Sequence, residues 1–347
     1  ICGVSIPEEY GGMGLDFNTG LLFTEALALG LSFATTIGAQ VSIGSLPIVF
    51  YGTPEQKQQY LPKIATGEYA CSYALTEPGS GSDANSAKSK AVLNEAGTHY
   101  LLNGQKMWIT NGCIDDKGTP ADVVWVYAKT GTDDRGRVQM STFLVEAGMP
   151  GYSVGQKIFD KTGMRASNTA ELVFDNCIVP ADNIVGSPGE SLIHMMGNLE
   201  LERLTLAAMA LGIARRSLDE MNKYATERTA FKSQIRDFGQ MQRYIGESWA
   251  KYRAMRAYIY DTANNLTIGT AGQRLDSDGV KLFATTAAKE IADAAMQVMG
   301  GYGYVAEYHV ERLWRDSKLL EIGGGTHESH QKNITRDLFK DSEAINR

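Results

Sequence analysis

Residues 195–213 of this 347-residue chain read MMGNLELERLTLAAMALGI, and this stretch predicts a long amphipathic helix. Residues three, four and seven positions apart share one face of a helix. One such stripe consists of Met195, Leu199, Glu202, Leu206, Met209 and Ile213. Every member of this stripe except Glu202 is apolar. The stretch therefore predicts a helix that faces a core and carries a single carboxylate on its apolar side.

The two carboxylates of this stretch are expected to have different environments. Glu200 lies about 200° around the helix from Glu202, where Arg203 can neutralise it. Glu202 stands among apolar side chains, so we expect a raised pKa, which suits a general base that works near neutral pH. The pattern alone leaves an alternative open, in which Glu202 pairs with a basic residue from another helix.

Composition limits the class of protein. The length predicts two or three domains. The chain has 33 Lys and Arg against 40 Asp and Glu, a formal charge of −7, so no basic field favours a nucleic acid partner. The sequence contains no run of about 18 apolar residues, so no membrane span is predicted. The cysteines at positions 2, 71, 113 and 177 are scattered without CxxC pairs, which predicts free thiols in a reducing compartment and no zinc site. The histidines at positions 327 and 330 lack HExxH spacing, so no metal is expected.

The hydrophobic period changes twice along the chain, in the order α, β, α. Residues 1–67 predict an N-terminal helical domain. Residues 68–185 contain short runs of β-branched and aromatic residues, which predict a central antiparallel β domain. Residues 186–347 predict a C-terminal helical domain. The chain opens without Met inside a structured-looking stretch, so we expect that the first domain is truncated at its start.

Local signals refine this division. Thr53 is the expected N-cap of a helix with Pro54 in its first position, and Asn103-Gly104 predicts a hairpin turn. The predicted long helices span 191–226, 238–266 and 277–299, with turns at 265–272 and 300–303.

Three glycine-rich segments are candidate ligand cradles. None follows a strand in a Gly-x-Gly-x-x-Gly pattern, so a Rossmann half is not expected. Residues 74–83 (ALTEPGSGSD) have N–H groups and hydroxyls that suit a polar cofactor, with a structural turn as the alternative. Residues 297–304 (QVMGGYGY) hold more glycines than a helix C-cap needs. Residues 323–326 (GGGT) precede a helix N-terminus, which favours anions and carbonyl oxygens.

Taken in order, these segments resemble the acyl-CoA dehydrogenase family over essentially the whole chain. The motifs that carry the resemblance are IPEEYGG at 6–12, LTEPGSGSD at 75–83, WITNG at 108–112, KTGMRAS at 161–167, QVMGG at 297–301 and GGGT at 323–326. The resemblance implies an α+β multidomain fold. It consists of an N-terminal helical domain, a central antiparallel β domain and a C-terminal four-helix bundle. It also implies a homotetramer with FAD between subunits.

Site residues follow from the same resemblance, motif by motif. It implies flavin contacts at Tyr73, Leu75, Thr76, Gly81, Ser82, Trp108, Ile109, Thr110, Arg228, Phe231, Phe238, Gln297, Val298, Gly300, Gly301, Thr326 and Glu328. It implies substrate contacts at Ser82, Glu200, Arg203, Gly324 and Gly325. The contacts at Arg228 and 297–301 would serve the FAD of a neighbouring subunit. The chain departs from the family where many members have Phe-Gln and this sequence has Phe238-Gly239-Gln240.

The family places its catalytic base in one of two positions. Many members carry Glu just before the final Gly-Thr, where this chain has Gly324. Members similar to isovaleryl-CoA dehydrogenase carry it in a Leu-Asp/Glu-Leu-Glu-Arg segment, which matches residues 199–203 (LELER). The resemblance thus implies Glu202 as the base, the residue that the helical stripe isolates.

The implied activity is FAD-dependent α,β-dehydrogenation of an acyl thioester, with Glu202 taking the α proton and flavin N5 the β hydride. Gly324 leaves room near the β carbon, which favours a short branched-chain or alicyclic acyl-CoA. Two alternatives stay open: a dehydrogenase or oxidase of an acyl or prolyl group on a carrier-protein phosphopantetheine, and a flavin monooxygenase or non-catalytic flavoprotein. The acceptor is expected to be an electron-transfer flavoprotein or oxygen. A bacterial protein would be cytoplasmic and a eukaryotic one would lie in the mitochondrial matrix.

Overall fold

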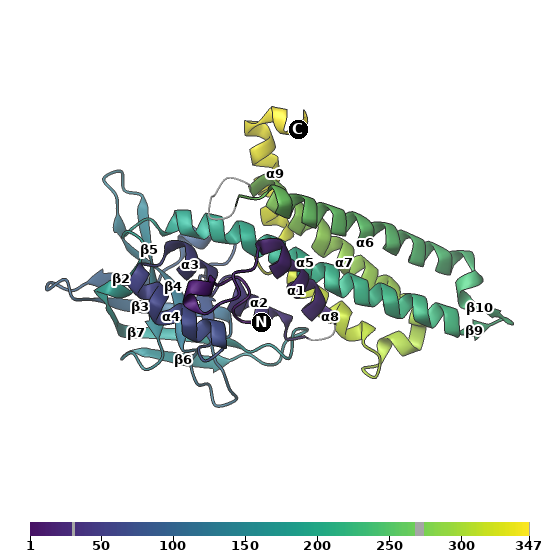
Figure 1. Cartoon of the computed structure of the whole chain (residues 1–347), viewed down its shortest axis with the longest axis horizontal. Helices are drawn as coiled ribbons and strands as arrows, with labels where there is room; N and C mark the ends of the chain where they lie inside the picture. Colours follow the sequence, from purple (N-terminus) through teal and green to yellow (C-terminus); the bar gives the residue numbers. More distant parts are fainter. Residues whose placement is uncertain (30–31, 268–273, 347) are drawn as a thin grey trace.

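Helices at the N-terminus pack beside a mixed β-sheet, and a long helix leads from that sheet into a helical bundle (Figure 1). The computed structural model describes residues 1–29, 32–267 and 274–346. The α-helices are α1 (Phe17–Ala28), α2 (Ala34–Val41), α3 (Leu46–Tyr51), α4 (Pro54–Thr66), α5 (Ser191–Glu227), α6 (Gly239–Asn265), α7 (Arg274–Met299), α8 (Val310–Leu320) and α9 (His327–Lys340). The strands are β1 (Cys71–Ala74), β2 (Lys90–Leu93), β3 (His99–Thr110), β4 (Val123–Thr132), β5 (Val138–Glu146), β6 (Tyr152–Lys157), β7 (Thr169–Pro180), β8 (Ile184–Val185), β9 (Thr229–Ala230) and β10 (Ser233–Gln234).

The N-terminal helices start as the sequence predicts. The Thr53 hydroxyl accepts from the N–H of Gln56 at 3.2 Å, and the Gln56 side chain accepts from the N–H of Thr53 at 3.1 Å. This capping box, with Pro54 in the first turn, confirms the predicted start of α4. Residues 34–51 form the one described stretch long and apolar enough to span a membrane, but they divide into α2 and α3 and more than half of them are buried.

The sheet has the strand order β6-β7-β3-β2-β4-β5-β8, with β1 beside β4. Most neighbours are antiparallel, as predicted, but β1 runs parallel to β4 with Cys71 opposite Val123. Side chains of β4 are buried on both faces of the sheet. Val124 and Val126 belong to the core of the β domain, and Trp125 on the other face packs toward the N-terminal helices. An uninterrupted apolar run is typical of a strand covered on both sides.

Asn103 and Gly104 do not form the predicted hairpin turn. Strand β3 runs through both residues, and its pairing with β7 shifts register between Leu102 and Gly104. Gly104 has a φ of 151°, and a β-carbon there would lie 2.2 Å from Oγ of Ser89. The glycine therefore permits a bulge and the close approach of another chain segment.

The turn that joins β2 to β3 lies a few residues earlier. The side-chain oxygen of Asn94 accepts from the N–H of Thr98 at 2.8 Å, and Gly97 has a φ of 71°. An Asn side chain that mimics a backbone turn and a glycine in the left-handed region are sufficient to reverse the chain.

The bundle is built around α5, which extends from the sheet to the far end of the molecule beside α6 and α7 (Figure 1). Small buried residues bring α5 and α7 together, namely Ala207, Ala208, Ala210 and Ala214 on α5 and Ala284, Ala287, Ala288 and Ala295 on α7. Helix α7 starts three residues before the predicted position, at Arg274. The predicted turn at 265–272 lies mostly outside the described residues.

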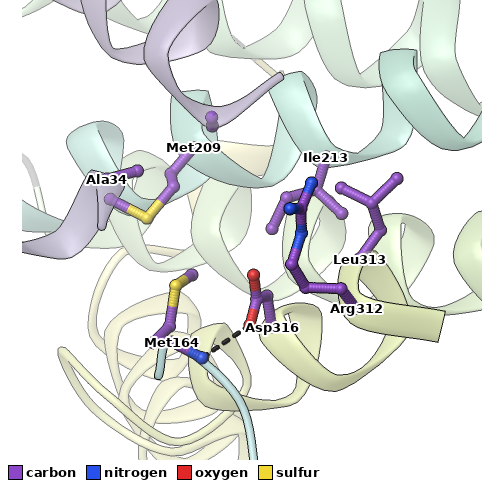
Figure 2. Close-up of a pocket in the computed structure, with 8 residues that line it drawn as sticks. Ala34, Met164, Met209, Ile213, Arg312, Leu313 and Asp316 are labelled. Carbon is purple, nitrogen blue, oxygen red and sulfur yellow. Dashed lines mark hydrogen bonds between the residues drawn. The ribbon is translucent and has the colours of Figure 1, made fainter. Parts of the chain in front are cut away.

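The 161–167 motif joins the β domain to the helices. Asp316 on α8 accepts from the N–H of Met164 at 2.5 Å and from the hydroxyl of Ser32 at 2.6 Å. The Met164 side chain is buried and points toward Met209 and Ala34 (Figure 2). The motif therefore has a structural role in this chain, because one buried carboxylate fixes two loops against α8.

We expect Gly212→Ala to destabilise the protein, although alanine usually stabilises a helix by about 1 kcal/mol relative to glycine. A β-carbon at Gly212 of α5 would lie 2.3 Å from the carbonyl oxygen of Glu25 on α1. The overlap is expected to cost about 1–3 kcal/mol, seen as a lower Tm. Gly246→Ala in α6 is the matched control, because its β-carbon meets no atom within 4 Å in this chain. A Tm that rises in both variants contradicts the expectation.

Candidate active site

Glu202 lies half-buried on α5 beside the glycine loop (residues 323–326), which connects α8 to α9. A β-carbon built on Gly324 would lie 3.6 Å from Oε1 of Glu202 and 2.3 Å from Cδ1 of Leu206. The two chain positions where the family resemblance allows a base therefore meet at one point in space. In this chain the carboxylate comes from α5, and position 324 of the loop contributes no side chain.

The carboxylate of Glu202 has the electrostatic character that the sequence predicts. Burial raises the pKa of Glu202, while the cations of Arg203 and Lys281 oppose that rise. Among the described residues, none forms a hydrogen bond or an ion pair with this carboxylate. The structure thus agrees with the predicted rise in the pKa of Glu202, and in its described part no helix supplies a direct partner for this carboxylate. A carboxylate with a raised pKa and no fixed partner can accept a proton near neutral pH.

The burial of α5 agrees with the prediction only in part, because Met209 and Ile213 of the stripe are buried in the core while the stripe residues around Glu202 are not. Leu199 and Leu206 of the apolar stripe are half-buried, whereas Glu200 and Arg203 are buried. Arg203 does not rely on Glu200 alone, because its Nη1 lies 3.1 Å from Oδ1 of Asp278 on α7. The side of α5 that carries Glu202 is therefore partly exposed. Other elements of the protein cover the opposite side.

The glycine loop has the geometry of a cradle. Gly324 and Gly325 have φ values of 63° and 99°, in the region that favours glycine. Within the described residues, no protein acceptor takes a hydrogen bond from the N–H groups of Gly324 and Gly325. Thr326 caps α9 by accepting from the N–H of Ser329 at 3.3 Å. Free N–H groups at the start of a helix favour an oxygen that carries negative charge.

The loop at residues 75–82 is fixed by a buried ion pair that sequence reasoning missed. Nζ of Lys106 lies 2.8 Å from Oε1 of Glu77 and donates to the carbonyl oxygen of Leu75 at 3.1 Å. Burial opposes ionisation of Glu77, but hydrogen bonds from Lys106 and from two backbone N–H groups outweigh it and lower the pKa of Glu77. The N–H groups of Gly81 and Ser82 have no acceptor among the described residues.

Trp108 lies on β3 next to this loop, whose Thr76 carbonyl accepts from the N–H of Met107 at 2.9 Å. Trp108 has a φ of 64°, its side chain is 62% exposed, and the pairing of β3 with β7 shifts register there. A large exposed aromatic side chain on a strained backbone suits a flat ligand. Ile109 is buried in the sheet core, so only its backbone is available to a ligand, and Thr110 is half-buried.

A second group of predicted flavin contacts lines a concave pocket of about 500 Å³ at the far end of α5. The pocket is lined by Tyr224, Arg228, Ile235, Val298, Met299, Gly300, Gly301, Tyr302, Val305 and Glu307. Gln297 is exposed beside it. Phe231 is 92% exposed and meets Phe238 edge to face, with ring centroids 6.1 Å apart.

These two groups do not meet within one chain. Glu202 and Arg228 are 26 positions apart along α5, which corresponds to roughly 39 Å. Figure 1 accordingly shows β9 and β10 at the opposite end of the bundle from the sheet. Tyr73 is buried on β1, and its hydroxyl has no hydrogen-bond partner among the described residues. Glu328 is exposed in the first turn of α9.

Two further sequence predictions concern cysteines and metals. All four cysteines carry free thiols, as predicted, and three of them are buried. Among the residues that the structure describes, no group of three or more His, Cys, Asp or Glu side chains is arranged to hold a metal ion. His327 instead lies 2.9 Å from the hydroxyl of Thr285, and His330 lies 2.5 Å from Asp278.

Comparison with known proteins agrees with this architecture. Models of the acyl-CoA dehydrogenase N-terminal, middle and C-terminal domains match residues 1–68, 72–177 and 192–339. Isovaleryl-CoA dehydrogenase from Oryza sativa is 40% identical over 98% of this chain and 80% of its own length. A probable acyl-CoA dehydrogenase from Bacillus subtilis is 40% identical over 98% of this chain, which spans 58% of that relative.

A solved acyl-CoA dehydrogenase from Bacillus anthracis, complexed with FAD, superposes with a TM-score of 0.89 at 37% identity, over 99% of this chain and 60% of that one. The fold and these matches define an FAD-dependent oxidoreductase of the α+β class. The chain belongs to the acyl-CoA dehydrogenase family.

We expect Glu77→Gln to lower the free energy of unfolding by about 3–5 kcal/mol, because it leaves Lys106 buried without its counter-ion. The loop at 75–82 then loses its anchor, so the variant is also expected to retain less FAD. Tm and the ratio of flavin to protein absorbance after gel filtration measure the two effects. Glu95→Gln, on the exposed turn after β2, is the control. Equal FAD content in both variants would contradict the anchoring role.

Proposed function

We propose that this protein catalyses α,β-dehydrogenation of a short branched-chain or alicyclic acyl-CoA, with Glu202 as the base. The observation that carries the proposal is the position of the half-buried Glu202 carboxylate beside the N–H groups of Gly324 and Gly325, where neither the carboxylate nor these N–H groups have a hydrogen-bond partner among the residues that the structure describes. A base and an oxyanion cradle at one point are the two parts that abstraction of a proton next to a thioester carbonyl needs.

The reaction removes two hydrogens from neighbouring carbons. Glu202 takes the α proton onto a carboxylate oxygen, and a carbon–carbon double bond forms as the β hydrogen leaves with its electron pair. When bound, FAD supplies the acceptor for that hydride. The N–H groups of Gly324 and Gly325 donate to the thioester oxygen, on which negative charge grows as the α proton leaves. Their contribution is largest in the transition state, so it raises kcat.

The described residues fit FAD in two places. The 75–82 loop offers free N–H groups beside the exposed indole of Trp108, and the pocket at Arg228 and Gly300 offers a concave surface next to exposed phenylalanines. Because the first place belongs to the sheet and Figure 1 shows the sheet and the β9–β10 end of the bundle at opposite ends of the molecule, we propose that each cofactor lies between two copies of the chain. We further propose Ser82, Glu200 and Arg203 as contacts of the thioester beyond its acyl group.

The acyl group is inferred from what the site omits. Gly324 has no side chain beside Glu202, so Leu206, whose Cδ1 lies 2.3 Å from the position of a β-carbon at Gly324, and the loop backbone bound the site where a branch at the β carbon would lie. Relatives at about 40% identity that bear the name isovaleryl-CoA dehydrogenase support the same choice. An electron-transferring flavoprotein is the proposed electron acceptor, and oxygen uptake during turnover distinguishes it from oxygen.

Anaerobic mixing with candidate thioesters tests the function. Oxidised protein is expected to lose flavin absorbance within one turnover with isovaleryl-CoA or cyclohexanecarboxyl-CoA, and more slowly with butyryl-CoA. A response to carrier-bound prolyl thioester alone would favour the carrier-protein alternative. Bound FAD that bleaches with none of these substrates would favour a monooxygenase or a non-catalytic flavoprotein.

Glu202→Gln is expected to keep FAD and thioester affinity and to lose at least about 10³-fold in kcat, since the amide cannot accept the α proton. Stopped-flow bleaching and a thioester titration measure the two properties separately. Glu55→Gln, on the exposed first turn of α4, is the control. Normal bleaching in the Glu202 variant would assign the base to another residue.

Gly324→Ala is expected to lower kcat/KM for isovaleryl-CoA about 10-fold or more beyond its effect on butyryl-CoA. The new methyl group would lie 2.3 Å from Cδ1 of Leu206, so it takes space from a branched acyl group. Gly323→Ala controls for a methyl group on the same loop, because the nearest atom to its β-carbon is 3.5 Å away. Equal losses on both substrates would indicate a general distortion of the loop.

A further inference from the structure

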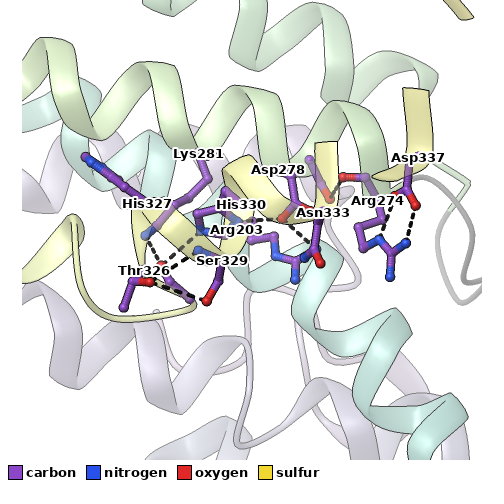
Figure 3. A network of polar contacts seen from close by, with 12 residues as sticks. Arg203, Arg274, Asp278, Lys281, Thr326, His327, Ser329, His330, Asn333 and Asp337 are labelled. Carbon is purple, nitrogen blue, oxygen red and sulfur yellow. Dashed lines mark hydrogen bonds and ion pairs between the residues drawn. The ribbon is translucent and has the colours of Figure 1, made fainter. Parts of the chain in front are cut away.

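A buried polar network of side chains from α7 and α9 holds the glycine loop in place (Figure 3). Nζ of Lys281, a fully buried residue of α7, donates to the carbonyl oxygen of Gly325 at 2.6 Å. Nε2 of His330 on α9 lies 2.9 Å from the same oxygen. Nδ1 of His330 lies 2.5 Å from Asp278, which also pairs with Arg203. Side chains from α7 and α9 thus meet at one carbonyl group, and Asp278 links them to Arg203 on α5.

Lys281 is the constant donor in this network. Both ring nitrogens of His330 face acceptors, and a neutral imidazole can donate from only one of them. Burial lowers the pKa of His330, which favours the neutral ring. An ammonium group carries three donors, so Lys281 can hold the Gly325 carbonyl whichever nitrogen of His330 carries the proton.

The carbonyl of Gly325 matters because the same loop carries the free N–H groups. A held carbonyl fixes the plane of its peptide, and the left-handed turn at Gly324 and Gly325 then sets the direction of the preceding N–H groups. A β-carbon at Gly325 would lie 2.9 Å from Cε1 of His330, so the loop is seated directly on the network. Preorganised donors of this kind need no rearrangement when charge develops.

Lys281 also brings a positive charge near Glu202, because it holds Gly325, and the β-carbon position of the adjoining Gly324 lies 3.6 Å from Oε1 of Glu202. Its ammonium is one of the two cations that favour the ionised form of Glu202, and burial lowers the pKa of Lys281 to about 8. The titratable and charged groups that face Lys281 or Glu202 are Tyr73 on β1, Arg203 on α5, Asp278 on α7, Glu321 after α8, and His327 and His330 on α9.

We propose that Lys281 is a positioning residue of the dehydrogenation: it holds the Gly325 carbonyl so that the loop N–H groups face the thioester oxygen, and its charge keeps Glu202 ionised near neutral pH. This inference rests on the proposed function. Lys281 touches neither the substrate carbons nor the proton in transfer, so its effect passes through Glu202 and the loop.

Three substitutions separate the two effects in the FAD-loaded protein. Lys281→Gln keeps an N–H donor and removes the charge, Lys281→Met removes both, and Lys281→Arg keeps both. For each, kcat and KM for the best thioester are measured from pH 5.5 to pH 9, together with Tm. Lys289→Gln, two turns further along α7 beside Trp314, is the matched control.

Glu202 must be ionised to act, so losing the nearby cation is expected to move the acidic limb of kcat/KM upward by about one pH unit in both the Gln and the Met variants. The Met variant is also expected to lose about tenfold in kcat with KM changed less than about threefold, because the loop donors act in the transition state. The Arg variant is expected to restore the midpoint of the limb.

The outcomes are distinguishable from a failure of the proposed function. Wild-type turnover with an unshifted acidic limb in both the Gln and Met variants overturns the inference and leaves the function standing. A shift of equal size in Lys289→Gln overturns it as well, because the effect then has no connection with the network. A wild type that bleaches with no thioester overturns the proposed function and this inference together.

Discussion

Two consecutive glycines in the left-handed region allow the segment between α8 and α9 to approach α5 closely. Glycine suits both positions, because the backbone is left-handed there and a β-carbon on Gly324 would displace Leu206, while one on Gly325 would approach His330. The approach places backbone N–H groups beside Glu202 while the adjacent carbonyl turns back toward Lys281 and His330. The site depends on this turn. It directs the backbone N–H groups of the loop toward a ligand and the adjacent backbone carbonyl toward the protein interior.

The long helix α5 relates this turn to the rest of the molecule. Its first half carries Glu202 and Arg203, and its small residues pack against α7, which supplies Asp278 and Lys281. Its last turn leads to the exposed hairpin of β9 and β10. One continuous helix thus fixes the distance between Glu202 and the pocket lined by Arg228 and Gly300.

Sequence reasoning succeeded where one local rule governs the structure. The Thr53 capping box and the α–β–α order follow from short-range signals, and the apolar stripe around Glu202 predicts the direction of its pKa shift. It failed where tertiary contacts decide. Asn103-Gly104 has the composition of a hairpin turn, but pairing with β7 and the close approach of Ser89 place it inside a strand. The parallel pairing of β1 with β4 also leaves no local trace.

Lys281 is an instructive omission. Its face of α7 also carries Ser277, Asp278 and Thr285, so the criterion of a lone charge among apolar residues, which isolated Glu202, does not isolate Lys281. The partner of Lys281 could not be predicted from the pattern of α7 either. The Gly325 carbonyl lies in a loop more than forty positions away, where His330 of α9 also meets it, and only the folded chain brings these groups together.

The meeting of Gly324 with the carboxylate of Glu202 has a wider consequence. The chemical group that the site needs occupies a location in space that two distant positions of the polypeptide can reach. A lineage of such proteins could transfer the group from one position to the other while keeping its architecture. A sequence alignment that is compared one position at a time would show two unrelated changes, although the geometry of the reacting atoms had been preserved.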